Sequence, residues 1–112
     1  MGQYATGDVL LASVRLNGHN NRKIRPLVVL KSRPGGFLEV CPVSSKPSSD
    51  VPSLVLTPDD FLEGGLDICR ESHILITFSL VIKTRDVLAK KGRVGPDVLH
   101  SLHILRQGFG KK

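Results

Sequence analysis

Residues 26–43 read PLVVLKSRPGGFLEVCPV, which is the strongest secondary-structure signal in the chain. The stretch contains two runs rich in Val and Leu, residues 26–31 and 37–43, separated by a few residues that include Pro-Gly-Gly at 34–36. Runs of this length and composition are typical of β-strands. A parallel crossover needs a dozen or more residues, so the short connection predicts an antiparallel hairpin.

Three further strand-like runs flank this hairpin, at residues 8–14, 53–57 and 72–83. Loop-forming sequences separate them, among them Asn17-Gly18 and the Ser- and Pro-rich residues 45–52. The strands follow closely on one another, with no helix between the first three. This order predicts a mainly β domain, either a small barrel or a sandwich. Because no internal repeat or long low-complexity stretch interrupts it, residues 1–112 are expected to form one domain with a core at about 4–107.

Two segments have helical signatures. The sequence Thr57-Pro58-Asp59-Asp60 offers a capping hydroxyl, a proline in the first turn and an acid at the third position, so it predicts a helix of about two turns that Gly64-Gly65 would end. The second helix is expected to begin at Pro96-Asp97. Its apolar residues recur at helical spacing, at Val98, Leu102, Leu105 and Phe109, before Gly108 and Gly110 end it. The basic residues 90–95 are expected to form a turn before this helix.

Composition excludes several classes of protein. The 112 residues are 40% hydrophobic and 23% charged, which is close to ordinary globular usage and argues against a disordered chain or a coiled coil. The longest apolar run, residues 74–82, is well short of the roughly 20 residues that span a membrane. The first residues lack the features of a signal peptide, so a soluble cytoplasmic protein is expected. Two cysteines, Cys41 and Cys69, are too few for a disulfide scaffold and are expected to be buried thiols.

Charge is distributed unevenly along the chain, which has 16 Lys and Arg against 10 Asp and Glu and a formal net charge of +6. Residues 15–46 and 83–112 are strongly basic, whereas residues 50–71 are acidic. A basic surface beside a segregated acidic segment favours a polyanionic partner. A surface that is charged only for solubility fits the same pattern equally well.

The common enzyme motifs are missing: there is no phosphate-binding loop of the Lys-Ser/Thr type, no nucleophile elbow and no His-Glu-x-x-His. His100 and His103 are three residues apart on the expected second helix. They lack a third ligand nearby in sequence, as do Cys69 and His73. These residues therefore predict exposed helix histidines and no metal site.

A possible phosphodiester site remains in the basic first third of the chain, formed by His19, Arg25 and Ser44. An arginine matches phosphate geometry, a serine can donate to a phosphate oxygen, and a histidine can move a proton near neutral pH. In RNA the attacking 2′-hydroxyl belongs to the substrate, so the protein needs no nucleophile of its own. By spacing alone, a loop histidine, a surface arginine and a turn serine fit these residues better than a site does.

Several short motifs follow one another from about residue 4 to about residue 105. In order they are Gly7-Asp8-Val9, Gly18-His19, Arg25-Pro26 leading into residues 27–30, Pro42-Val43-Ser44-Ser45, and LAKKGRV at 88–94 followed by residues 96–105. Together they resemble the MazF/PemK family of bacterial toxins, which includes Kid-like members. The resemblance implies an SH3-like antiparallel β-barrel of the MazF/CcdB type, with one short helix and a C-terminal helix.

The resemblance also implies an activity. Toxins of this family form homodimers and cleave single-stranded RNA, often mRNA, at short sequences without a metal or cofactor, leaving a 2′,3′-cyclic phosphate and a 5′-hydroxyl. A cognate antitoxin blocks the groove. By position, Arg25 would stabilise the phosphorane, Ser44 would replace the catalytic Thr or Ser, and His19 would be the loop histidine near the phosphate. Five further residues are expected to contact RNA: Arg22, Lys23, Ser45, Lys46 and Lys83.

One departure from the family pattern concerns the general base. Residues 77–80, Thr-Phe-Ser-Leu, stand where the family often carries an Asp-Gln pair. Arginine side chains stay protonated in proteins, so Arg25 is assigned to charge stabilisation. Either His19 is the base or the enzyme is weakened. Two alternatives stay open: a toxin of this fold that binds a protein such as DNA gyrase, and a barrel that binds RNA without cleaving it.

Overall fold

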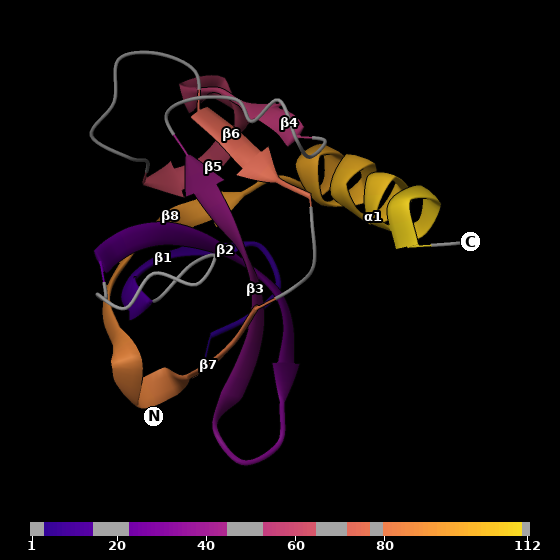
Figure 1. The fold of residues 1–112 in the computed structure, drawn as a ribbon. Coiled ribbons are helices and arrows are strands. Elements are labelled where there is room, and N and C mark those ends of the chain that lie inside the picture. Colours follow the sequence, from indigo (N-terminus) through magenta and orange to yellow (C-terminus); the bar gives the residue numbers. More distant parts are fainter. Residues whose placement is uncertain (1–3, 15–22, 45–52, 65–71, 77–79, 111–112) are drawn as a thin grey trace.

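The computed structural model describes residues 4–14, 23–44, 53–64, 72–76 and 80–110 (Figure 1). Its strands are β1 (Asp8–Val14), β2 (Lys23–Arg33), β3 (Phe37–Ser44), β4 (Ser53–Leu56), β5 (Phe61–Gly64), β6 (Ser72–Leu75), β7 (Leu80–Lys83) and β8 (Val87–Val94). The helix α1 spans Pro96–Gly110, and two 3-10 turns lie at Pro58–Asp60 and Thr84–Asp86. No helix in these ranges is long and apolar enough to cross a membrane.

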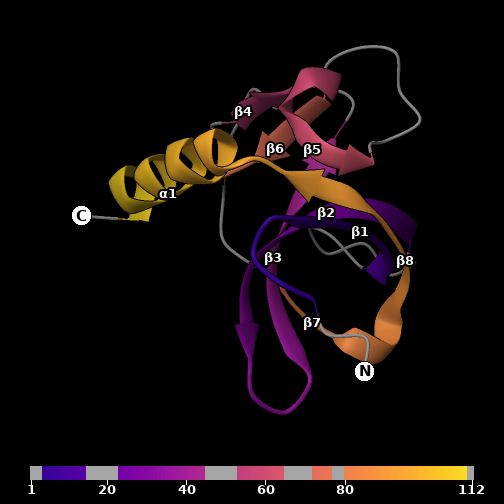
Figure 2. The ribbon, with the colours of Figure 1, turned by 180° about the vertical axis from the view of Figure 1, so that it is seen from behind.

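The strands form one strongly curled antiparallel sheet in the order β4-β6-β3-β2-β1-β8-β5. The strand β3 is shared between two neighbours on one edge, because it pairs with β7 near its start and with β6 at its end. Figures 1 and 2 show the sheet curving into a half-barrel, with α1 beside β4 and β6 at one end. The prediction of a mainly β, barrel-like fold with a C-terminal helix is confirmed.

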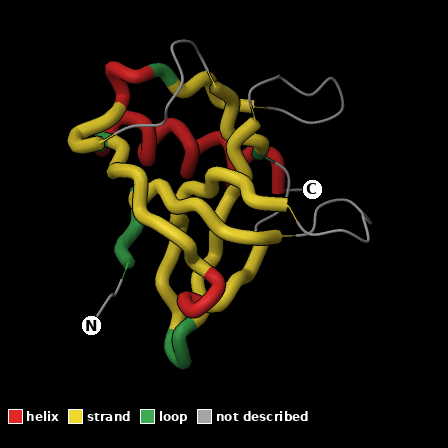
Figure 3. Tube along the Cα trace, turned by 90° about the vertical axis from the view of Figure 1, so that its left-hand side faces the viewer, coloured by secondary structure: helices red, strands yellow, loops and turns green. Residues whose placement is uncertain are grey.

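The predicted hairpin is also confirmed. The strands β2 and β3 pair antiparallel on either side of residues 34–36, where Gly35 and Gly36 have φ values of 83° and 82°. Glycine adopts this left-handed conformation without steric cost, which explains the sequence of the turn. The Gly36 carbonyl accepts a hydrogen bond of 2.8 Å from the Thr84 amide, so the turn is attached to the segment after β7 (Figure 3).

The first three strands are buried on both faces. On one face Val9, Val28, Cys41 and Val43 belong to a core shared with β4, β6 and α1, here called the helix-side core. On the other face Leu10, Leu27, Val29, Leu38 and Val40 form the barrel core with Ile82 of β7. Strands buried on both faces are expected to be continuously apolar, and this explains the run of Val and Leu at residues 27–30. Polar side chains are left to the strand ends.

The prediction of a short α-helix after Thr57 is wrong. The predicted capping interaction is present, because the Asp60 carboxylate accepts a hydrogen bond of 2.8 Å from the Thr57 amide. Only the 3-10 turn Pro58–Asp60 forms, however. Phe61 then pairs with Val94 of β8 and packs against the helix-side core, so the chain continues as β5. Gly64 ends this strand with φ 65°, and a Cβ there would lie 2.1 Å from the Lys91 carbonyl oxygen.

The basic turn expected at residues 90–95 is also wrong, because residues up to Val94 belong to β8, between β1 and β5. Two of these bases, Lys90 and Arg93, are neutralised by Asp8, which is 1% exposed. Its Oδ1 lies 3.1 Å from Arg93 Nε and 3.4 Å from Lys90 Nζ. Part of the basic segment therefore belongs to ion pairs centred on one buried carboxylate.

Residues 72–83, expected as one strand, form β6 and β7. Val43 lies opposite Ile74, and Val40 lies opposite Leu80. Between these two pairs β3 covers three residues, from Val40 to Val43, whereas the paired segment covers six, from Ile74 to Leu80. One regular strand cannot pair in both registers, so the ladder is divided.

The C-terminal helix is confirmed as α1. Val98 and Leu102 are buried against the helix-side core, whereas Leu105 is 38% exposed, so the buried stripe is narrower than the sequence predicts. His100 and His103 are exposed on this helix, as expected.

The thiol of Cys41 is 1% exposed, and burial raises its pKa from 9.0 to about 11, against a smaller opposing effect of Arg106. Thiolate is the reactive form, so iodoacetamide at pH 8 is expected to modify Cys41 in denaturant and to spare it in the folded protein.

The unfolded chain loses the Cys41 thiol proton at a lower pH than the folded protein does. Folding stability from this group should therefore be complete below pH 9.0 and fall as the pH rises towards 11. Peptide mass spectrometry and urea midpoints at pH 8 and 10 measure both effects; equal labelling of Cys41 in native and denatured protein would contradict them.

Candidate functional site

Two of the predicted site residues lie at the ends of neighbouring strands, where these strands leave the core. Arg25 is near the start of β2, and Ser44 is the last residue of β3. The β2–β3 ladder runs through Val29–Val40, Val28–Cys41 and Leu27–Pro42. The ladder ends there, and its register, if continued by two residues, would bring Arg25 opposite Ser44. The predicted arginine and serine therefore belong to adjacent strand ends.

Two prolines explain why the ladder stops before this point. Pro26 on β2 and Pro42 on β3 have no backbone N–H and cannot donate to a neighbouring strand. At its end β3 gains a different neighbour on its other edge, because Ser44 pairs with His73 of β6. The polar strand ends therefore lie at a change of pairing partners.

Arg25, Ser44 and His73 share one face of the sheet. Directly opposed residues in antiparallel strands project to the same side, and side chains alternate along each strand. Arg25 is thus on the side of Leu27 and the barrel core, and Ser44 follows Val40 and Pro42 on that side. We call these three residues the polar row. Each of them is half-buried, between the closed core and the solvent.

General strand geometry sets the size of this row. Opposed Cβ atoms in an antiparallel pair are about 5 Å apart, which applies to Ser44 and His73. Arg25 and His73 are two strands apart, or roughly 10 Å at the usual strand spacing. A phosphate group resting on Ser44 would lie between a guanidinium and an imidazole.

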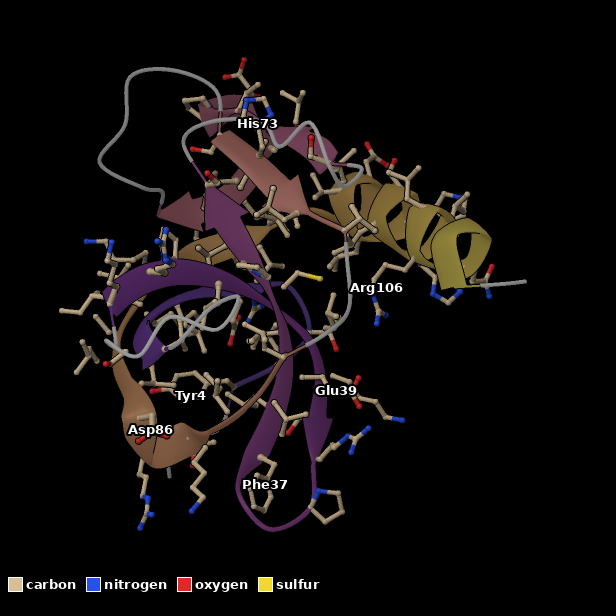
Figure 4. All side chains as sticks on the ribbon, in the orientation of Figure 1. Tyr4, Phe37, Glu39, His73, Asp86 and Arg106 are labelled. Atoms are coloured by element: carbon tan, nitrogen blue, oxygen red, sulfur yellow. The ribbon has the colours of Figure 1, made fainter. Side chains whose placement is uncertain are left out.

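His73 was considered in the sequence only as a metal ligand. Figure 4 shows it near the end of the β4–β6 pair, and its other cross-strand neighbour is Val55 of β4. Its Nδ1 is buried and, among the residues that the structure describes, has no hydrogen-bond partner. Only the pairing register shows that this histidine neighbours Ser44; no local sequence signal does.

The other residues predicted to contact RNA do not lie together in the structure. Lys23 is exposed on the same face as Arg25, two residues nearer the start of β2. Lys83 lies opposite Phe37 at the far end of β3, seven residues or roughly 23 Å of extended strand from Ser44. His19, Arg22, Ser45 and Lys46 lie outside the described residues.

Lys83 belongs to a basic hollow beside the hairpin turn. The hollow has a volume of about 270 Å³ and is lined by Gly35, Gly36, Phe37, Lys83, Thr84 and Arg85. Its two cations and open backbone suit an anion more than an apolar ligand. Lys83 is therefore separate from the polar row and belongs to a second basic patch on the same molecule.

Several basic side chains pair with acidic partners among the described residues. Arg33 pairs with Glu39, and Lys90 and Arg93 pair with Asp8. Among the described residues, no carboxylate forms an ion pair with Arg25 or Lys23. Within the same part of the chain, no group of three or more His, Cys, Asp and Glu could hold a metal ion.

Comparison with known proteins supports the fold. No protein-family model and no curated protein matches the sequence. Among solved structures, the chain is similar to MazE-MazF from Deinococcus radiodurans in Form-II, with a TM-score of 0.63 and 15% identity over 94% of this chain and 93% of that chain. The Form-III structure gives a TM-score of 0.63 at 14% identity, over 94% of each chain. The protein therefore has a MazF-like fold.

Proposed function

We propose that this protein is the toxin of a type II toxin-antitoxin pair and cleaves single-stranded RNA without a metal. The proposal rests on Arg25 and Ser44, which lie on adjacent strands of a MazF-like fold just beyond the last pair of the β2–β3 ladder, Leu27–Pro42. A guanidinium with no carboxylate partner among the described residues, beside a hydroxyl, forms a site for one phosphodiester group.

In the proposed reaction the ribose 2′-oxygen attacks the adjacent phosphorus. The O2′–P bond forms, the P–O5′ bond breaks, and the products end in a 2′,3′-cyclic phosphate and a 5′-hydroxyl. Arg25 donates hydrogen bonds to the phosphoryl oxygens, where negative charge increases in the transition state. The Ser44 hydroxyl donates to the same group and fixes its position, so the nucleophile comes entirely from the substrate.

RNA on either side of the cleaved linkage would follow basic residues. Lys23 would contact the phosphate next to the polar row, and Lys83 would hold RNA several nucleotides away, in the basic hollow. His19, Arg22, Ser45 and Lys46 are proposed to contribute to the same track. The described residues include few aromatic side chains, so contacts to the backbone and polar groups would dominate over base stacking.

A homodimer and an antitoxin are part of the same proposal. Several large apolar side chains are exposed on the single chain, among them Ile24 (62%), Val81 (51%) and Leu88 (59%), and a second copy would cover some of them. The matching structures are of MazE-MazF. An acidic antitoxin segment would compete with RNA for the basic surface and gain association rate from its charge.

The proposal is tested by incubating a mixed-sequence single-stranded RNA with the protein in EDTA. We expect cleavage, with 5′-hydroxyl ends that a kinase labels directly and cyclic phosphates on the other ends. Ser44→Ala should slow cleavage by about 100-fold, the usual effect of removing one transition-state donor. Ser32→Ala, an exposed serine elsewhere on β2, serves as the matched control.

Three results would count against the proposal. RNA that stays intact with the wild-type protein but binds in a salt-dependent manner would indicate a non-catalytic RNA-binding protein. Equal rates for Ser44→Ala and Ser32→Ala would remove Ser44 from the site. Growth arrest without RNA cleavage would favour a protein target.

A further inference from the structure

A polar atom without a partner lies next to the proposed site. The Nδ1 of His73 is buried and, within the described part of the chain, accepts or donates no hydrogen bond. Buried polar groups are nearly always paired, because an unpaired one loses its interaction with water and receives nothing in return. An unpaired group that persists beside a functional site calls for a role in that site.

The pairing register relates this imidazole to the proposed chemistry. His73 is the direct cross-strand neighbour of Ser44 and projects to the same face, on the opposite side of Ser44 from Arg25. The Cβ atoms of His73 and Ser44 are about one cross-strand distance apart, roughly 5 Å. A ribose attached to a phosphate held at Ser44 would reach the imidazole, while the phosphoryl oxygens faced Arg25.

From this arrangement we infer that His73 is the general base that removes the proton from the attacking 2′-hydroxyl of single-stranded RNA bound at Arg25 and Ser44. The inference rests on the proposed function and adds the group that the sequence lacks at residues 77–80. In the step, the 2′-hydroxyl proton passes to the imidazole as the O2′–P bond forms. The P–O5′ bond then breaks, and the leaving 5′-oxygen takes a proton from water. The imidazolium returns its proton to solvent after the products leave.

The other described side chains are poorly placed for this task. Arginine stays protonated, so Arg25 cannot accept the proton. The carboxylate of Glu39 pairs with Arg33, five residues back along β3 from Ser44, and that of Asp8 pairs with Arg93 on another part of the sheet. His100 and His103 are exposed on α1, the helix that packs against the opposite, helix-side core.

The neighbours of His73 also fit a proton acceptor. Its cross-strand partners are Ser44 on β3 and Val55 on β4. An imidazole nitrogen can accept a proton from a hydroxyl within hydrogen-bond reach. The half-buried ring is open enough for substrate to reach it.

The test uses His73→Gly with and without added imidazole, under the EDTA conditions that give cleavage by the wild type. Loss of a general base should lower kcat/KM by about 100-fold or more. Imidazole supplied in solution should raise kcat/KM of His73→Gly by at least about tenfold, because it can enter the vacated space and accept the proton. The restored rate should increase with the basicity of substituted imidazoles. A purely structural histidine would show neither behaviour.

His73→Gln and His100→Ala complete the experiment. Glutamine keeps a polar side chain of similar length but accepts no proton at neutral pH, so His73→Gln should be as slow as His73→Gly while melting near the wild-type temperature. His100→Ala should cleave at the wild-type rate, with no response to imidazole. If His73→Gly does not fold, His73→Gln decides.

Wild-type rates in His73→Gln would overturn the inference, as would a folded, slow His73→Gly that imidazole does not accelerate. Either result, with cleavage still dependent on Arg25 and Ser44, leaves the proposed function standing. Intact RNA with the wild-type protein would instead remove the proposed function itself.

Discussion

Arg25→Ala is expected to lower kcat/KM for RNA cleavage by about 1,000-fold. The guanidinium offers donors in a planar fork to a phosphoryl group, and its contribution increases as charge moves onto the oxygens in the transition state. The fall should therefore appear mainly in kcat, with a smaller rise in KM. Single-turnover cleavage of an end-labelled RNA measures the chemical step.

Two further variants give this result its meaning. Arg25→Lys keeps one positive charge but loses the planar fork, so it should recover only part of the activity. Arg33→Ala, at the opposite end of β2 and paired with Glu39, is the matched control and should cleave normally. Equal activity in Arg25→Ala and Arg33→Ala would exclude Arg25 from the site.

Asp8→Ala is expected to destabilise the fold by about 2 kcal/mol, because a buried acceptor is lost while its partners Lys90 and Arg93, 33% and 41% exposed, stay partly solvated. The Asp8 carboxylate is 1% exposed. It accepts a hydrogen bond of 2.9 Å from the Ala5 amide and pairs with Arg93 and Lys90 of β8. Its removal would leave a backbone donor unpaired and two cations side by side, where β8 joins the centre of the sheet.

Urea unfolding measures this effect. Asp8→Asn should lie between the wild type and Asp8→Ala, because the amide oxygen can still accept from Ala5. Asp59→Ala, an exposed acid in the 3-10 turn, should change stability by no more than about 0.5 kcal/mol. A loss below about 1 kcal/mol in Asp8→Ala would show that solvent already screens the network.

Local sequence rules predicted the parts of the fold that local interactions determine. The hairpin was predictable because the Pro-Gly-Gly turn and the two apolar runs around it carry their own signals. The helix α1 was predictable from the spacing of Val98 and Leu102. In both cases the segment's own preference agrees with its packing.

The wrong predictions concern segments whose structure depends on distant partners. A helix after Thr57 did not form because Phe61 pairs as a strand with Val94, more than 30 residues away in the chain. The segment predicted as a basic turn forms β8, where Asp8 of the neighbouring strand β1 neutralises Arg93. Neither partner can be read from a local window, so propensity was overridden by tertiary contacts.

The candidate site divides in the same way. Arg25 and Ser44 follow recognisable strand sequences, so both were identifiable as candidates, and the register now places them on adjacent strand ends; their roles stay predictions. His73 was identifiable only as a residue without metal partners, since its place beside Ser44 depends on how residues 72–75 pair with β3. A histidine in a short strand carries no signal of its neighbour.

The site itself can be observed in a crystal structure of the protein bound to the RNA sequence that it cleaves, with a 2′-deoxy sugar at the scissile linkage so that attack cannot occur. We predict that the scissile phosphate lies over Ser44, with hydrogen bonds from the Arg25 guanidinium and the Ser44 hydroxyl, and that the 2′ carbon faces the imidazole of His73. A scissile phosphate held elsewhere, for example in the hollow beside Lys83 or along α1, with Arg25 and Ser44 making no contact to it, would contradict the assignment.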